Sequence, residues 1–342
     1  MGETQAVTFQ GVVTPHGPRT DEIASIALKE RLQNNTTTEI KLWGHPECPI
    51  EEVEKFLNQG FLPIEIGDLN YKAVGVGSAA EATVKTLGYD LSNLSPGEMT
   101  LLDMLARRNQ NGYMNQFHMS LPRILKDVYD LQGYNEEDVM NRFKDIVYSF
   151  LEYEDRPEGA NLLQIREELQ DLAKKTEQCQ NAPFTPGRYL RDLCYRNEPT
   201  EQIREKVSFW ITAWNRWQEE FSKARNEWPT VEKLHFSVLG LPAAAVETTN
   251  RFLAKVCFGK DQPDRVDIFV SRNPETGHAV IMTRKKDVSA LHRELGRLEP
   301  GLWYWHESAG NIINGGPLYP EVTPTSLPLS ELAGLISKFP PR

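Results

Sequence analysis

Three residues near the start of the chain, His16, Asp21 and Glu22, have the types and spacing that metal binding requires. They follow Val7–Val13, which predicts a β-strand, and Asp21 and Glu22 lie in Thr20–Leu32, whose apolar spacing predicts a helix. In an open α/β sheet, loops at the carboxyl ends of strands line the ligand crevice. An imidazole and carboxylates in such a loop could bind a divalent ion. Alternatively, the carboxylates only complement the helix dipole.

A second pair of acids ends the predicted strand Phe61–Ile66. Glu65 and Asp68 would face the same crevice as His16, because the carboxyl ends of parallel strands meet at one edge of a sheet. Arg19 lies in the first loop, where a guanidinium would suit a phosphate through two parallel hydrogen bonds.

Glycines precede another predicted helix. Gly75, Gly77 and Ser78 come directly before the helical sequence AAEATVKTLG. Backbone N–H groups at a helix N-terminus can hold a phosphate. The same sequence is also typical of an ordinary turn, and both interpretations stay open.

A polar, glycine-rich segment follows the aromatic residues Trp303, Tyr304 and Trp305 near the C-terminus. We expect a loop here that brings its backbone close to another group, with anion binding and a purely structural turn as the alternatives. The candidate phosphate contacts in this segment are His306, Ser308, Gly315 and Gly316.

The segment Gln202–Trp228 predicts a long helix with an aromatic seam. The residues of the seam are Trp210, Trp214, Trp217, Phe221 and Trp228. Such a seam could pack in a core, pack against a partner helix or stack on nucleic-acid bases.

Strands and helices alternate through the first part of the chain, which predicts an α/β fold with a parallel, Rossmann-like sheet. The strands are expected at Val7–Val13, Glu39–Trp43 and Phe61–Ile66. Residues 96–228 are expected to be helical and to complete the domain that begins in 1–95. Residues 229–342 predict a smaller α+β domain in which a last helix covers Ser330–Ser337.

The composition excludes a disordered or fibrous protein, since 39% of residues are hydrophobic and 25% are charged. The formal charge, 38 − 48 = −10, argues against coating nucleic acid through net charge. No stretch of about 18 apolar residues suggests a membrane span, and no signal peptide is evident. Four well-separated cysteines are typical of reduced thiols. We therefore expect a cytoplasmic protein without membrane partners.

Taken together, several motifs resemble the DHH phosphoesterase superfamily, in particular its bacterial branch related to Myg-type nucleases. VVTPHGPRTDEIASIALKERL resembles the first motif, FLPIEIGD the second acidic strand end, and GSAAEATVKTLG the helix after the signature motif. LWYWHESAGNIINGG and PTSLPLSELAGLI resemble the C-terminal substrate-binding region, whose histidine and glycines contact phosphate in the family.

The resemblance implies two divalent metal ions that activate a water molecule. The ions are usually manganese in the family, and manganese or magnesium would be expected in this chain. His16 and Asp21 match the first motif, and Asp68 or Glu65 matches the second. The chain departs from the family between Asp68 and Ser78, where LNYKAVGVG replaces the Asp-His-His signature. Gln110-Asn111-Gly112 likewise stands where the family has Asp-Asn-Gly.

These losses predict a degenerate phosphoesterase-like protein that is non-catalytic or weakly active. We expect an inter-domain cleft that binds a nucleotide, an oligonucleotide or a protein partner. Two alternatives remain: an active divalent-metal-dependent phosphodiesterase or nuclease, and an interaction scaffold that uses the tryptophan-rich helix at 202–228.

Overall fold

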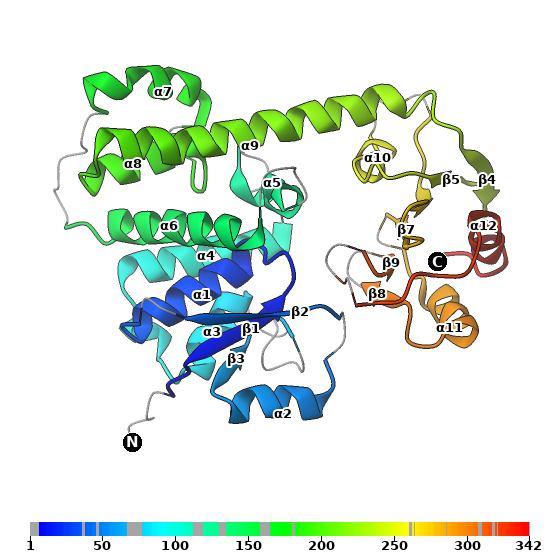
Figure 1. The fold of residues 1–342 in the computed structure, drawn as a ribbon, viewed down its shortest axis with the longest axis horizontal. Helices are drawn as coiled ribbons and strands as arrows, with labels where there is room; N and C mark the ends of the chain where they lie inside the picture. The colour runs from blue at the N-terminus through cyan, green and yellow to red at the C-terminus, as the bar shows by residue number, and fades with distance from the viewer. Residues whose placement is uncertain are drawn as a thin grey trace. The chain divides into compact units, whose positions relative to one another are not determined.

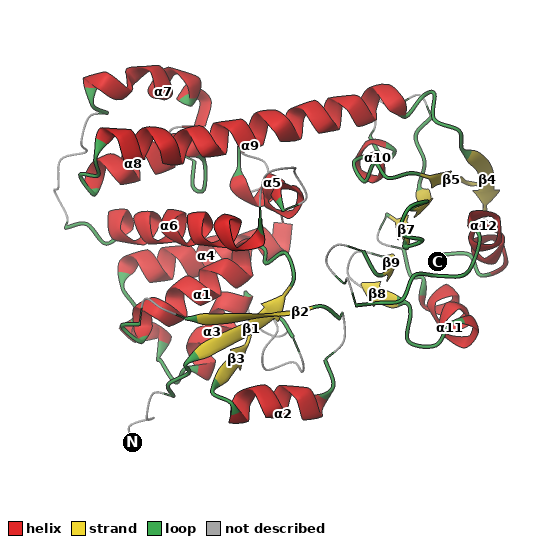
Figure 2. Ribbon diagram, in the orientation of Figure 1, coloured by secondary structure: helices red, strands yellow, loops and turns green. Residues whose placement is uncertain are grey.

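The computed structural model describes residues 7–35, 38–45, 48–66, 77–111, 119–129, 135–157, 165–179, 182–259, 262, 264–284, 286–306, 310–316, 319 and 321–341. The chain forms two compact units: Met1–Trp43 with Cys48–Trp217, and Gly44–Glu47 with Gln218–Arg342. It is an α/β protein with a parallel sheet in the first unit and a separate mixed sheet in the second (Figure 2). The predicted fold class is confirmed.

The sheet of the first unit has three parallel strands in the order β2-β1-β3. Their bounds are β1 Gly11–Pro15, β2 Glu39–Trp43 and β3 Phe61–Pro63. Helices α1 (Thr20–Leu32), α2 (Ile50–Asn58) and α3 (Ala79–Thr86) alternate with these strands or follow them. Val12 of β1 packs with Ile26 of α1 and Ala79 of α3 in one buried cluster, so α1 and α3 cover the same face of β1.

The remainder of the first unit is helical (Figure 1). Its helices are α4 Pro96–Asn111, α5 Leu121–Val128, α6 Glu136–Glu154, α7 Gln170–Lys175 and α8 Pro186–Tyr195, with 3-10 turns at Leu91–Asn93, Glu167–Leu169 and Glu177–Cys179. The long helix α9, Thr200–Glu227, belongs to the first unit up to Trp217 and to the second unit from Gln218. Asn135 caps α6 by accepting a hydrogen bond of 2.8 Å from the Asp138 N–H. Helix α7 is short and follows the 3-10 turn at Glu167–Leu169, and residues 161–164 lie outside the described part of the chain.

The tryptophans of α9 are interior residues. Trp210, Trp214 and Trp217 are buried, and the rings of Trp214 and Trp217 stack with their centroids 5.2 Å apart. The Trp210 indole N–H donates a hydrogen bond of 3.1 Å to the Met119 carbonyl. Trp228, just after α9, is also buried. These four side chains are therefore core residues, and they offer no exposed aromatic face to bases or to a partner.

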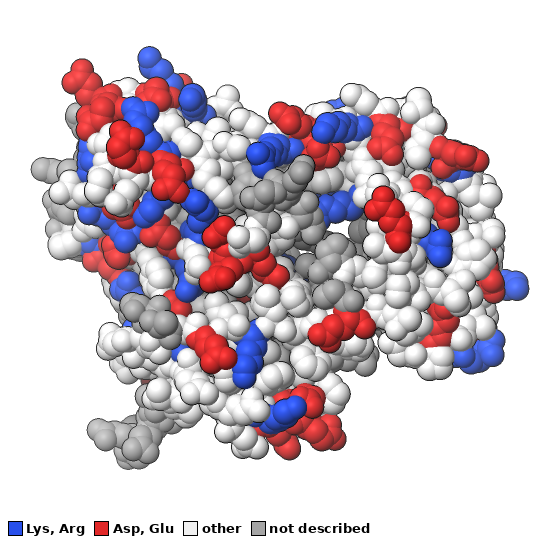
Figure 3. All heavy atoms as spheres, in the orientation of Figure 1, with Lys and Arg blue, Asp and Glu red and all other residues white. Residues whose placement is uncertain are grey.

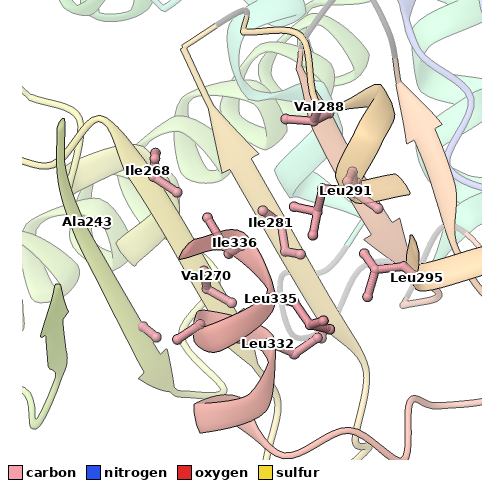
Figure 4. Packing of buried hydrophobic residues seen from close by; sticks show 14 of the residues in the cluster. Ala243, Ile268, Val270, Ile281, Val288, Leu291, Leu295, Leu332, Leu335 and Ile336 are labelled. Atoms are coloured by element: carbon pink, nitrogen blue, oxygen red, sulfur yellow. The ribbon is translucent and has the colours of Figure 1, made fainter. Parts of the chain in front are cut away.

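The second unit has a six-stranded sheet in the order β4-β5-β6-β7-β9-β8, in which only the β5–β6 pair is parallel. The strands are β4 Leu234–Val238, β5 Leu241–Glu247, β6 Ile268–Arg272, β7 Ala279–Thr283, β8 Tyr304–His306 and β9 Asn311–Asn314, and the helices are α10 Leu253–Val256, α11 Ser289–Leu298 and α12 Leu329–Lys338. Figure 4 shows Val270 and Ile281 of the sheet packed with Leu291 of α11 and Ile336 of α12.

Strand β9 corrects one expectation. The segment after His306 was predicted as a loop, but Asn311–Asn314 pairs antiparallel with both β7 and β8. Asn314 is tolerated in a buried strand because its side chain is fully bonded: the amide donates to the Leu302 and Thr323 carbonyls, and its oxygen accepts from the Thr325 N–H.

Within the described residues, no helix combines the length and the apolar character needed to cross a membrane. On the face drawn in Figure 3, acidic and basic side chains are interspersed and form no large basic patch.

Candidate functional site

The carboxyl end of β1 is the most polar part of the first sheet. β1 lies between β2 and β3, so the chain leaves β1 toward one side to form β2 and later reaches the other side to form β3. Ligands of open α/β sheets bind at such points, outside the carboxyl ends of the strands. His16–Glu22 follow β1 there, and Glu65 follows β3.

Asp21 caps helix α3. Its carboxylate accepts hydrogen bonds from the Ala79 and Ala80 N–H groups, each 3.0 Å long, and from the Asn109 side-chain amide at 2.8 Å. Burial raises the pKa of Asp21, as does the neighbouring Glu22 carboxylate, whereas the three hydrogen bonds lower it, and the net direction is upward. Both oxygens already face N–H donors, so a metal ion would have to displace them.

The N–H groups of α3 that could have held a phosphate are occupied. Besides the two bound to Asp21, the Glu81 N–H donates to the Ser78 hydroxyl at 3.0 Å, and the Gly77 N–H donates to the Glu81 carboxylate at 2.9 Å. A side chain at Gly77 would also overlap Ala106 of α4. Phosphate contacts at Gly77 and Ser78 stay a prediction, although the structure shows that Asp21, Ser78 and Glu81 already accept hydrogen bonds from the N–H groups at this helix start.

His16 contacts α6 instead of Asp21. Its Nδ1 lies 3.1 Å from Glu136 Oε2, and the other oxygen of Glu136 accepts the Gly17 N–H. Gly17 has φ +60°, a conformation that favours glycine. The Tyr129 hydroxyl donates to the Pro18 carbonyl. The loop after β1 is therefore fastened to the helical part of the unit.

Arg19 bridges the acids of the site. Its Nε and Nη2 donate to Glu22 Oε1 at 2.9 and 2.8 Å, and Nη2 lies 4.0 Å from Glu65 Oε2. The Arg19 side chain is 46% exposed, whereas that of Glu22 is 2% exposed. Arg19 can therefore reach solvent while it neutralises a buried carboxylate.

Four buried polar atoms in this region have no hydrogen-bond partner among the described residues: Thr14 Oγ1, Thr20 Oγ1, Glu22 Oε2 and Arg108 Nε. We call Thr14, Arg19, Thr20, Glu22 and Arg108 the β1 site. Thr14 lies two residues after Val12 in β1, so it faces the same side, toward α1 and α3. Buried polar atoms are almost always bonded, and a group of exceptions requires an explanation such as a ligand or ordered water.

Arg108 connects the β1 site to α4. Burial lowers the pKa of its guanidinium, the Glu22 carboxylate raises it, and Arg19 lowers it. Its neighbour in sequence, Asn109, holds Asp21 and also donates to the Gly77 carbonyl at 3.2 Å. The Asp21 carboxylate also raises the pKa of Arg108, but the Arg108 Nε has no hydrogen-bond partner among the described residues, so it could donate a charge-assisted hydrogen bond to an anionic ligand.

The described residues do not fit a two-ion centre. They contain no group of three or more His, Cys, Asp or Glu side chains placed to hold a metal ion. His16 is bound to Glu136, and Asp21 is bound to α3. Asp68, the remaining predicted ligand, lies outside the described residues.

The candidate phosphate contacts near the C-terminus belong to the second unit. His306 ends β8, and its side chain, like Ser308, lies outside the described part of the structure. At Gly315, with φ +62°, a Cβ atom would overlap the His278 ring, and His278 Nε2 lies 3.0 Å from the Val322 carbonyl. The backbone at Gly315 therefore lies close to the His278 ring of the same unit. Gly316 has φ +117° with open space around it.

Arg108, Asn109 and Glu136 were missed from the sequence. Arg108 and Asn109 directly precede Gln110, where the family's Asp-Asn-Gly was sought; Gln110 is exposed, and the Asn111 side chain and Gly112 lie outside the described residues. The sequence signal that could have identified Arg108 and Asn109 is the run of polar residues at the end of the otherwise amphipathic helix α4. Glu136 looked like an ordinary first-turn acid.

Comparison with known proteins gives a weak likeness to solved structures. No family model matches the sequence, and no curated protein matches it. Among solved structures, a pGpG-specific phosphodiesterase, PggH from Vibrio cholerae, aligns with 90% of this chain and 94% of its own at 12% identity, with a TM-score of 0.32. A TM-score of this size does not establish a shared fold or function.

Proposed function

We propose that this chain is a phosphoesterase-like binding protein that holds a nucleotide or another phosphodiester at the β1 site without metal-dependent hydrolysis. The observation that carries the proposal is the buried Nε of Arg108, which has no hydrogen-bond partner among the described residues and whose electrostatic neighbours are Glu22, Arg19 and Asp21. The hydroxyls of Thr14 in β1 and Thr20 at the start of α1 are likewise buried without a partner among the described residues, and ligands of α/β sheets bind at the ends of such strands.

The donors and acceptors match the two kinds of group in a nucleotide. A guanidinium binds phosphate oxygens through charge-assisted hydrogen bonds, and the threonine hydroxyls can donate to the same oxygens. Glu22 Oε2 can only accept, so it suits a ribose hydroxyl or an exocyclic amino group.

Hydrolysis is left out of the proposal because the carboxylate best placed for a metal is already used. Asp21 accepts three N–H groups, and two of them belong to the backbone of α3. Metal-assisted phosphoryl transfer needs ions that activate water and polarise the phosphoryl oxygen. Freeing Asp21 for that purpose would uncap α3.

The test is calorimetric titration of nucleoside monophosphates and a 5′-phosphorylated dinucleotide, in EDTA, into wild-type, Arg108→Met and Arg107→Ala proteins. Arg107 is the matched control because it is 55% exposed and pairs with Asp103 on the same helix. Hydrogen bonds to charged groups are worth about 1.5–3 kcal/mol, or roughly 10- to 150-fold in affinity. We expect a loss of that size in Arg108→Met and unchanged affinity in Arg107→Ala.

Two results would contradict the proposal. Equal affinity of wild type and Arg108→Met would show that Arg108 does not contact the ligand. Hydrolysis of the dinucleotide that requires manganese and disappears in Asp21→Asn would favour the alternative, a metal-dependent phosphodiesterase.

A further inference from the structure

A pocket of about 400 Å³ lies in the first unit among α5, α6, α8 and α9, and none of its lining residues belongs to the β1 site. Pockets of roughly 300–1,000 Å³ are typical of small-molecule sites. The tryptophan-rich helix α9 supplies one of its walls.

The walls of the pocket are mostly apolar and aromatic. The uncharged lining residues of α5, α6, α8 and α9 include Ile124, Phe143, Tyr189, Phe209, Trp210 and Ala213. The Trp210 indole is held by its hydrogen bond to Met119, and the Tyr189 and Trp210 rings lie with centroids 6.0 Å apart. Both residues are buried, so their rings form a rigid apolar wall of the pocket.

The charged wall of the pocket is balanced within the protein. Asp145 accepts hydrogen bonds from the Tyr189 hydroxyl, from Lys206 at 2.9 Å and from Arg196 at 3.0 Å. Burial raises the pKa of Asp145, but these hydrogen bonds outweigh it, so the carboxylate stays ionised. Lys206 also pairs with Glu198 at 2.8 Å. Asp138, an exposed acid, also lines the pocket and accepts a hydrogen bond of 2.7 Å from the Asn135 amide. Among the described lining residues, both cations are thus paired, and an anionic ligand would find no unpaired cation.

The remaining cation that lines the pocket is stacked and paired. The Arg142 guanidinium lies 4.3 Å from the centre of the Phe209 ring and 3.0 Å from Glu205 Oε1. The side chains of Arg142 and Glu205 are 35% and 65% exposed, so this pair borders solvent. It adds a planar surface at the rim without adding net charge.

We propose that this pocket binds a small, uncharged, planar aromatic molecule. The aromatic walls supply stacking and apolar contact, and the balanced charges disfavour an ionised ligand. This site is independent of the nucleotide proposed for the β1 site.

The test uses N-phenyl-1-naphthylamine, an uncharged aromatic fluorophore, titrated into the 342-residue chain, with indole as competitor. Ala213 is buried and lines the pocket, so Ala213→Phe fills it from α9. Arg204→Ala is the control. Arg204 lies on the same helix as Ala213 and, like the lining residue Arg142, is 35% exposed, but it pairs with Asp171 and does not line the pocket. Ala213→Leu provides a milder filling variant, and circular dichroism checks that each variant is folded.

We expect saturable binding with one site per chain, displacement by indole, and an affinity at least tenfold weaker in folded Ala213→Phe or Ala213→Leu but unchanged in Arg204→Ala. Wild-type protein should also melt at a higher temperature with indole bound. Absence of saturable binding, or equal affinity in a folded filling variant, would overturn the proposal.

Discussion

Replacing Asp21 tests whether this carboxylate is a helix cap or a metal ligand. In Asp21→Ala, the buried Ala79 and Ala80 N–H groups lose their acceptor, whereas the amide of the exposed Asn109 can turn to water. Each unsatisfied buried group costs about 1–3 kcal/mol. The two backbone groups, with partial relaxation, give an expected loss of about 2–5 kcal/mol in the free energy of unfolding.

Asp21→Asn should cost less. The asparagine side chain keeps one acceptor oxygen, but its NH2 group replaces the other oxygen and faces an N–H donor. The substitution also removes the negative charge that is favoured at a helix N-terminus. Relief of the repulsion from Glu22 and of the buried charge, which together raise the pKa of Asp21, offsets part of this loss. The expected net destabilisation is about 1–2 kcal/mol.

The assay is urea unfolding followed by circular dichroism, in EDTA so that no metal contributes. Asp103→Asn is the control, since Asp103 is 54% exposed on α4 and its ion pair with Arg107, which is 55% exposed, is weakened by solvent. A metal ligand without a structural role predicts the opposite result: Asp21→Asn would be as stable as wild type or more stable. That outcome would refute the capping assignment.

Two further predictions concern pH and backbone geometry. Burial raises the pKa of Asp192 from 3.8 to about 7 despite its 2.7 Å contact with Arg188, so the folded state binds a proton more tightly than the unfolded state. The stabilisation that Asp192 contributes is therefore complete below about pH 4 and is lost as the pH rises through about 7. The free energies of unfolding at pH 5 and pH 8 should differ less in Asp192→Asn than in wild type. An equal difference in the two proteins would contradict the raised pKa of Asp192. Gly315→Ala should destabilise the second unit by about 1–3 kcal/mol, since it combines φ +62° with overlap of the His278 ring. Gly301→Ala, at φ +75° with open space around it, should cost clearly less in the same thermal unfolding assay; equal costs would show that the His278 contact is unimportant.

Helices and strands were predicted from the sequence more accurately than the tertiary contacts between side chains. Helix α1 and strand β2 have the predicted bounds because the periodicity of apolar residues is a local signal. Strand β9 was missed because its two asparagines and flanking glycines resemble a loop, and only tertiary hydrogen bonds to Asn314 explain them.

The candidate site shows the same limit more sharply. The sequence identified His16, Asp21 and Arg19 as polar residues after a strand, but not their partners. Asp21 meets α3 and α4, and His16 meets Glu136 of α6, across separations of 58 to 120 residues. Nothing local in the chain encodes these pairings, so the interpretation of His16 and Asp21 as joint metal ligands could not be separated from two unrelated structural roles.

The most direct test of the proposed function is one calorimetric titration: a 5′-phosphorylated dinucleotide into wild-type protein in EDTA, repeated with manganese in place of EDTA. The account predicts saturable binding in EDTA, at an affinity that manganese leaves within a few-fold, with no product formed. Binding that appears only with manganese, or turnover during the titration, would contradict the claim that the β1 site binds its ligand without a metal.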